Sequence, residues 1–270
     1  MLSNKTIGFI GGGAMAEALV RGILAAKLVT ADKITVCDVA EERLKFLSSA
    51  FGVATSLDSK AVAGKVDVLF LAVKPQVIHG ILSLIAPAVK KETLVITIAA
   101  GITIAAVEDK LPGVPIIRVM PNTPVAVSAG MAAVALGSHA TTAMGDLTSL
   151  VFSAVGRAVV VAESAMDAVT GLSGSGPSFA YVLIDALSDA GVRVGLPRQM
   201  SLTLAAQTLL GAAKMVLDTG EHPAKLRDMV TSPGGTSIAG VHVLEQRGVR
   251  AALIDAVVAA AERSREMGKK

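Results

Sequence analysis

The chain has 270 residues, of which 52% are hydrophobic and only 3% aromatic, enough apolar material for a sizeable core in roughly two domains. Its formal net charge of +3 comes from scattered basic residues without stacking aromatics beside them, which argues against a nucleic-acid partner. The single cysteine, Cys37, excludes an intrachain disulfide and is expected to be a buried packing thiol.

Because the N-terminus leads within a few residues into an apolar strand, no cleavable leader is expected. No apolar run is expected to reach the roughly 18 residues of a membrane span, so we predict a cytoplasmic protein without a membrane partner. The mean hydropathy of +0.63 is high for a soluble monomer, which predicts that a second subunit covers some apolar helix faces.

The first half alternates short β-branched runs with helical patterns, the pattern of a parallel sheet covered by helices. The run ending at Val73 is apolar without alternation, as expected for a strand buried on both faces. Strands are predicted at 6–10, 33–38, 66–73, 93–98, 116–120 and 131–136, and helices at 14–26, 41–50, 76–89 and 104–110.

A glycine-rich turn, Gly11-Gly12-Gly13-Ala14-Met15-Ala16, follows the first strand directly and opens the first helix. This is the context of a dinucleotide-binding fingerprint: Gly11 permits the tight turn and Gly13 lets a pyrophosphate approach the backbone. Asp38 ends the second strand, where an acidic side chain commonly bonds the ribose 2′-hydroxyl of NAD. Arg43, one helical turn later, is either a phosphate partner or an ordinary surface charge.

After Ser138 the pattern changes to a helix at 141–152, a short strand at 158–161, and then helical segments alone. A cluster of Gly171, Gly174, Gly176 and Pro177 is expected to kink or interrupt the first of these. Further helices are predicted at 178–192, 197–219, 223–230, 235–246 and 248–267. We therefore predict a Rossmann-type, doubly wound and mostly parallel sheet over residues 1–162, followed by an all-helical domain over residues 163–270.

The segment Ser232-Pro233-Gly234-Gly235-Thr236-Ser237 lies where a helix begins. Its glycines let backbone N–H groups turn inward, and the helix start adds unpaired donors and a positive dipole end. The pattern predicts a cradle for a small anion; a well-capped helix with a tight entry turn is the simpler interpretation.

Other catalytic patterns are not found in the sequence: there is no GxSxG elbow, no His or Cys cluster with metal spacing and no pair of catalytic carboxylates. The four histidines, His79, His139, His222 and His242, are dispersed and are expected to be surface or capping residues.

Several blocks together resemble the pyrroline-5-carboxylate reductases, which reduce a cyclic imine in the last step of proline biosynthesis. Besides the fingerprint and the segment 226–240, the blocks are Ala72-Val73-Lys74-Pro75-Gln76, Ala99-Ala100-Gly101, 118–124, 167–177 and 189–198, in that family's order. The resemblance covers nearly the whole chain. It implies an NAD(P)H-dependent reductase that forms homodimers through the helical domain, often in a larger assembly such as a decamer.

The resemblance also implies roles for individual residues. Cofactor contacts fall to Gly11, Gly12, Gly13, Ala14, Met15, Asp38, Ser59, Ala72, Val73, Lys74, Pro75, Ala99, Ala100 and Gly101. The substrate carboxylate falls to Ser232, Gly235 and Thr236, with Glu163 as an acidic contact or a helix-start acid. Ser237 stands where most relatives carry Thr, and it is expected to orient the imine nitrogen or relay a proton, because a hydroxyl is too weak an acid to protonate an imine unaided.

Three questions stay open at this level. Asp38 argues mildly for NADH, whereas the family uses either NADPH or NADH, so dual use is expected. A β-hydroxyacid dehydrogenase is disfavoured because Ala180 occupies the position of that group's catalytic lysine. A broader imine reductase remains an alternative, and so does a non-catalytic dinucleotide sensor, which would not need the Ser232–Ser237 cradle.

Overall fold

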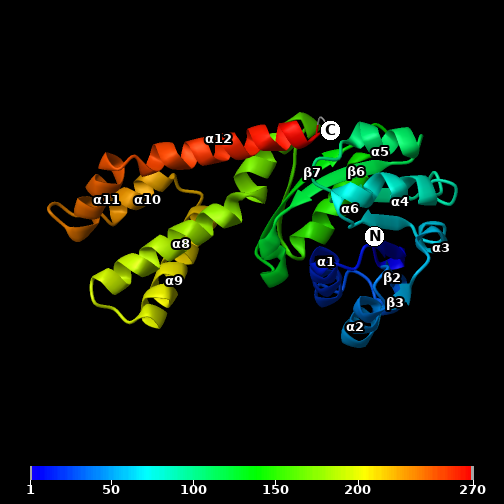
Figure 1. The fold of residues 1–270 in the computed structure, drawn as a ribbon, viewed down its shortest axis with the longest axis horizontal. Coiled ribbons are helices and arrows are strands. Elements are labelled where there is room, and N and C mark those ends of the chain that lie inside the picture. The colour runs from blue at the N-terminus through cyan, green and yellow to red at the C-terminus, as the bar shows by residue number, and fades with distance from the viewer. Residues whose placement is uncertain (1, 269–270) are drawn as a thin grey trace. The chain divides into compact units, whose positions relative to one another are not determined.

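The computed structural model describes residues 2–268, which form two compact units: one of residues 2–174 with 260–268, the other of residues 175–259. In Figure 1 the sheet with its helices runs from blue to green, and the helices of the second unit run from yellow-green to orange-red. The predicted domain boundary at 162/163 remains a proposal.

The first unit is built on an 8-stranded sheet with the order β3-β2-β1-β4-β5-β6-β7-β8. Strands β1 to β6 are mutually parallel, β7 is antiparallel to β6, and β8 is parallel to β7. The strands are β1 (Ile7–Ile10), β2 (Ile34–Cys37), β3 (Ala54–Ser56), β4 (Val68–Leu71), β5 (Leu94–Thr97), β6 (Ile116–Pro121), β7 (Gly130–Leu136) and β8 (Gly156–Val160). The mostly parallel α/β sheet is confirmed.

Two apolar cores lie on opposite faces of this sheet, because successive strand residues point to opposite sides. On β4, Phe70 belongs to one core and Leu69 to the other. Helices α1 (Ala14–Ala25), α2 (Glu41–Phe51) and α6 (Thr142–Ser153) cover the first face. Helices α3 (Ser59–Ala63), α4 (Ile78–Ile85) and α5 (Ile104–Lys110) cover the second.

Two predictions on the first unit were wrong in detail. The short strand β3 and the helix α3 were missed, so the run ending at Val73 contains the fourth strand and not the third. The helix expected at 76–89 is a 3₁₀ turn, Pro75–Val77, followed by α4, which ends at Ile85 just before Pro87.

The interruption predicted around the Gly/Pro cluster is confirmed. A 3₁₀ turn (Glu163–Ala165) and α7 (Met166–Val169) pass into a π-helical turn, Thr170–Gly174, before α8 begins at Gly176. Gly174, at the end of this turn, packs close to β6: a Cβ there would lie 2.8 Å from Met120 Cε, the far end of a flexible side chain.

The second unit is helical and exposes many apolar side chains. It contains α8 (Gly176–Arg193), α9 (Arg198–Thr219), α10 (Pro223–Met229), α11 (Thr236–Gln246) and most of α12 (Val249–Gly268). Leu204 and Leu210 on α9 are 51% and 59% exposed, and Tyr181 on α8 is 61% exposed. Helix α9 is also long and apolar enough to cross a membrane by length and composition, which corrects the expectation that no run reaches that length.

Candidate functional site

The fingerprint turn lies where the carboxyl ends of β1, β2 and β4 meet. Gly11 N–H donates to Cys37 O at 2.8 Å, and Ala72 N–H donates to Ile10 O at 2.8 Å. Gly11 has φ +99°, and a Cβ there would lie 2.4 Å from Ala72 O, so only glycine fits. The turn therefore lies at the topological switch point of the sheet, where open α/β sheets bind ligands.

Helix α1 begins directly after this turn, at Ala14, with Met15 as its second residue. Its N-cap, Gly13, supplies no side-chain cap, and nothing in the structure lies within 4 Å of a Cβ built on it. Ala16 is 1% exposed and packs in the core, which keeps the helix close to the sheet. Uncapped helix N–H groups facing open space suit an anionic pyrophosphate, so the residues present fit a dinucleotide.

Asp38 reaches back to the same turn from the end of β2. Its Oδ2 accepts from Gly12 N–H at 2.6 Å and its Oδ1 from Ala40 N–H at 2.9 Å. Arg43 on α2 donates from Nε to Gly12 O and from Nη2 to Glu17 Oε2, each at 2.5 Å. Of the two interpretations left open for Arg43, the structure shows neither a free phosphate partner nor a loose surface charge: its guanidinium is bound to the turn.

The remaining predicted cofactor residues lie on neighbouring turns of the same sheet edge. Val73 and exposed Lys74 follow β4, with Pro75 opening the 3₁₀ turn. Ala99 and Ala100 follow β5, and Gly101 comes next with φ +76°. A Cβ built on Gly101 would lie 3.9 Å from the backbone carbon of Met267, near the end of α12. Ser59 is different: it is 8% exposed at the first position of α3.

Glu163 is engaged by two groups that the sequence did not reveal. Its Oε1 accepts from Ile104 N–H at 2.7 Å, at the start of α5, and from Arg118 Nη1 at 3.0 Å. Arg118 lies on β6 and is 6% exposed. The Glu163 carboxylate thus contacts the first turn of α5, and Glu163 is also the first residue of its own 3₁₀ turn. Both positions suit the helix-start acid that was one of the two expectations for this residue.

Asn122 connects β6 with the π-helical turn. Its side-chain amide donates to Ser173 O at 3.0 Å, and its amide oxygen accepts from Met131 N–H at 2.8 Å. Sequence reasoning included this residue in a family block without a role. An asparagine between two prolines in an otherwise apolar run is the signal that could have singled it out.

The predicted anion cradle lies at the start of α11 in the second unit. Gly234 has φ +67°, Gly235 is the N-cap, and Gly235 N–H donates to Ser232 O at 3.0 Å. Ser232, Thr236 and Ser237 are exposed, and within residues 2–268 their hydroxyl groups have no hydrogen-bond partner. The structure brings the four predicted cradle residues, Ser232, Gly235, Thr236 and Ser237, together in one turn. They belong to the other unit from the fingerprint and Glu163.

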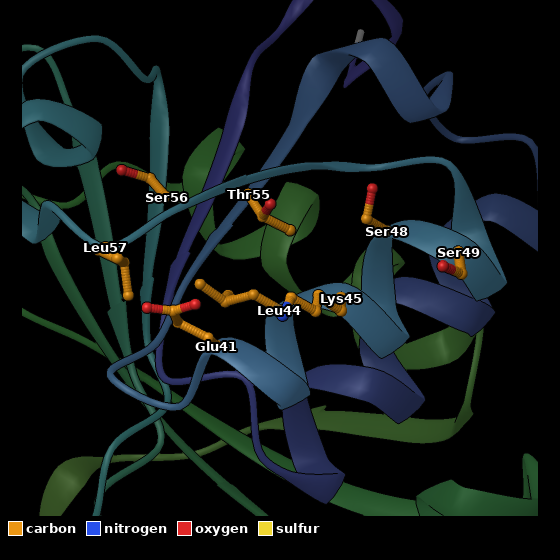
Figure 2. A pocket seen from close by; sticks show the side chains of 8 residues that line it. All are labelled: Glu41, Leu44, Lys45, Ser48, Ser49, Thr55, Ser56 and Leu57. Carbon is orange, nitrogen blue, oxygen red and sulfur yellow. The ribbon is translucent and has the colours of Figure 1, made fainter.

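An open depression lies beside α2 and β3, and Figure 2 shows the side chains that line it. None of the predicted site residues is among them; the lining residues are Glu41, Leu44, Lys45, Ser48, Ser49, Thr55, Ser56 and Leu57. Cys37 lies close to the same sheet edge and is 4% exposed, as predicted. Burial, and then the charges of Asp38 and Asp58, raise the pKa of its thiol to about 11.

The sheet, its switch-point turn and the helical second unit define a dinucleotide-dependent oxidoreductase. A family model described as "NADP oxidoreductase coenzyme F420-dependent" matches residues 6–101, and one described as "Pyrroline-5-carboxylate reductase dimerisation" matches residues 163–267. A pyrroline-5-carboxylate reductase of Methanosarcina acetivorans is 49% identical over 100% of both chains. One from Synechocystis is 46% identical over 98% of both.

Solved structures agree. The chain matches a pyrroline-5-carboxylate reductase of Coxiella burnetii with a TM-score of 0.94 and 34% identity, over 99% of this chain and 100% of that one. It matches the Plasmodium falciparum reductase, solved with NADP bound, with a TM-score of 0.88 and 29% identity over 99% and 100%. The chain belongs to the pyrroline-5-carboxylate reductase family.

Family membership confirms several predictions. The protein is an NAD(P)H-dependent oxidoreductase with pyrroline-5-carboxylate reductase activity, and it acts in proline biosynthesis. The matched dimerisation domain makes it a homodimer, and α9 with its exposed leucines lies inside the matched segment.

Proposed function

We propose that the turn Gly11–Met15 and the neighbouring turns hold the cofactor, and that the Ser232–Ser237 cradle holds the substrate carboxylate. The observation that carries the first part is the uncapped start of α1 with open space at Gly13. Helix N–H groups there bind the pyrophosphate, Asp38 accepts from a ribose hydroxyl, and Lys74 lends positive charge nearby. Ala72, Val73, Pro75, Ala99, Ala100 and Gly101 leave room for the rest of the cofactor.

The bound cofactor supplies a hydride for the imine carbon; the chain supplies binding and orientation. The N–H group of Thr236 and the Ser232 hydroxyl hold the carboxylate at the positive end of α11, and Gly235 N–H joins them by leaving Ser232 O, to which it donates at 3.0 Å. Ser237 orients the ring nitrogen or relays a proton to it. The free hydroxyls of this turn support the assignment, because no partner within the described residues competes for them.

Two of the predicted contacts are more constrained. Oε1 of Glu163 is occupied by Arg118 and the start of α5, so a substrate contact falls to its other oxygen. Ser59 is largely covered, so a cofactor contact there requires close approach to the start of α3. Both remain proposals.

We further propose a cytoplasmic enzyme whose dimers associate into a larger assembly, such as a decamer. The many apolar side chains that the second unit exposes support an extensive subunit contact. Size-exclusion chromatography with light scattering decides the assembly size.

The decisive experiment follows oxidation of NADPH and of NADH with pyrroline-5-carboxylate as substrate. Turnover is expected with the carboxylate substrate and at least tenfold less with an uncharged cyclic imine of the same ring size, because the cradle then has no anion to hold. Equal turnover of both imines would favour a broader imine reductase. Cofactor binding without turnover would favour a sensor.

A further inference from the structure

Two acidic residues lie beside the turn that receives the cofactor: Asp38 accepts from Gly12 N–H, and Glu17 holds Arg43, which also donates to Gly12 O. Oε2 of Glu17 accepts from Arg43 Nη2, and Oε1 accepts from Arg21 Nη2, each at 2.5 Å. Glu17 is 18% exposed and Arg43 28% exposed, so solvent screens this pair only in part. The guanidinium of Arg43 also lies 5.0 Å from the centre of the Phe46 ring.

One of the two edges of Arg43 that suit a phosphate, the edge formed by Nε and Nη2, is occupied. A guanidinium binds a phosphate or carboxylate most strongly through two parallel N–H donors. Here Nε donates to Gly12 O and Nη2 to Glu17, so that edge is bound to the turn itself. An arginine near the end of the second strand is the usual partner of the NADP 2′-phosphate, and in this chain a 2′-phosphate must compete with Glu17 for the charge of Arg43.

Asp38 also disfavours binding of the NADP 2′-phosphate. Its carboxylate can accept from a ribose 2′-hydroxyl but has no proton to donate to a phosphate oxygen. Two backbone N–H groups fix its position, so it cannot turn away at little cost. A 2′-phosphate would therefore meet a fixed negative charge and an arginine already neutralised.

We infer that this chain binds NADH more tightly than NADPH, and that Glu17 is a specificity-determining residue that acts by holding Arg43. The inference rests on the proposed placement of the cofactor at the Gly11–Met15 turn. It adds a stated preference to the use of NAD(P)H that family membership shows. It also names a residue outside the usual end-of-strand position as the source of the discrimination.

The test measures dissociation constants of NADH and NADPH directly, from the change in coenzyme fluorescence on binding to the intact dimer. The wild-type protein is expected to bind NADH at least tenfold more tightly than NADPH. Glu17→Gln frees Arg43, and we expect it to tighten NADPH binding at least fivefold while NADH changes less than twofold. In Glu17→Gln/Arg43→Ala, the gain for NADPH is expected to disappear.

The matched control is Glu42→Gln, which removes one exposed carboxylate on α2 next to Arg43. The Glu42 side chain has no hydrogen-bond partner among the described residues. It is expected to change neither constant by more than twofold. Equal or tighter NADPH binding by the wild type would overturn the inference without any variant. A preference for NADH that Glu17→Gln leaves intact would overturn the role of Glu17.

Failure of the proposed cofactor site gives a different result. If NADH binds and is turned over but Gly11→Ala and Asp38→Asn both leave its dissociation constant unchanged, the cofactor lies elsewhere. In that case the placement is wrong, and the inference built on it is overturned with it.

Discussion

The fingerprint turn of the first unit and the cradle of the second are both glycine turns at a helix start. They differ in whether their polar groups have hydrogen-bond partners within the protein. At the fingerprint, side chains of the same unit bind the turn: Asp38 takes Gly12 N–H and Arg43 takes Gly12 O. At the cradle, the hydroxyl groups of Ser232 and Ser237 have no partner among the described residues. The fingerprint turn is therefore held in place by side chains of its own unit, whereas the hydroxyl groups of the cradle are available to a ligand or to another protein surface.

The largest effect is expected from a substitution in the fingerprint turn. Gly11→Ala places a Cβ 2.4 Å from Ala72 O at φ +99°, so we expect a loss of about 2 to 4 kcal/mol in unfolding free energy. We also expect at least a hundredfold weaker NADH binding. Urea denaturation and coenzyme fluorescence measure the two effects.

Gly13→Ala serves as the control, because nothing lies within 4 Å of a Cβ there. Its stability should stay close to that of the wild type while its cofactor binding weakens. A stable Gly11→Ala variant that binds NADH normally would contradict the argument from close approach.

The next largest effect is expected on the association of the two subunits. Leu210→Glu places a charge on an exposed apolar position of α9, and we expect the dimer dissociation constant to rise at least a hundredfold, because desolvating an unpaired charge is costly. Light scattering across a dilution series measures it. Gln207→Glu adds the same charge at an exposed polar position of the same helix and should have a smaller effect. An unchanged dimer would place Leu210 outside the subunit contact.

At the cradle, Ser237→Ala should lower kcat/KM roughly tenfold to a hundredfold, the cost of a lost hydrogen bond to a charged group. The unfolding free energy should not change, because Ser237 is exposed and its hydroxyl has no partner among the described residues. Ser237→Thr, the residue that the resemblance expects here, should retain activity. A normal rate in Ser237→Ala would remove this hydroxyl from the mechanism.

A smaller effect is expected at the ion pair between β6 and the turn at Glu163. Among the described residues, Glu163 is the only partner that we find for the buried guanidinium of Arg118. Glu163→Gln weakens this contact, so the unfolding free energy should fall by about 1 to 3 kcal/mol. The control is exposed Glu92→Gln, expected within about 0.5 kcal/mol of the wild type. If Glu163→Gln keeps full stability and loses activity alone, its contact with substrate is the dominant role.

The smallest effect depends on pH. The pKa of the Cys37 thiol is about 11 in the folded chain and 9.0 ordinarily, so the unfolded chain loses this proton first. Its contribution to stability is present below pH 9 and declines between pH 9 and 11, by about 1 to 2 kcal/mol. Urea denaturation across this range, compared with Cys37→Ala, isolates the effect. The same decline in both proteins would assign it to other groups.

Much of the fold follows from patterns that are local in sequence. Buried strands such as Val68–Leu71 and the fingerprint after β1 are continuous signals, and the Gly/Pro cluster predicted the π-helical turn. The strand Ala54–Ser56 could not be found in the same way, because it is short, polar and exposed at the edge of the sheet. Helix α3 did have a signal, since Asp58 caps it by accepting from Ala61 N–H.

The candidate site could be predicted only where its residues are neighbours in sequence. The cradle and the fingerprint each fall within one short segment. The partners of Arg43 and Glu163 lie 26 to 59 positions away, and charge alone does not indicate which acid an arginine meets. A single sequence therefore predicts where the ligands bind but not how the turn around them is held.

The exposed Tyr181 on α8 has a practical consequence for spectroscopy. The chain contains no tryptophan and this one tyrosine, so its intrinsic ultraviolet emission comes from a single ring in the helical unit. That emission reports the surroundings of α8 alone. Light from reduced nicotinamide can be read with little protein background, so a single cuvette can separate events at the helices from events at the coenzyme.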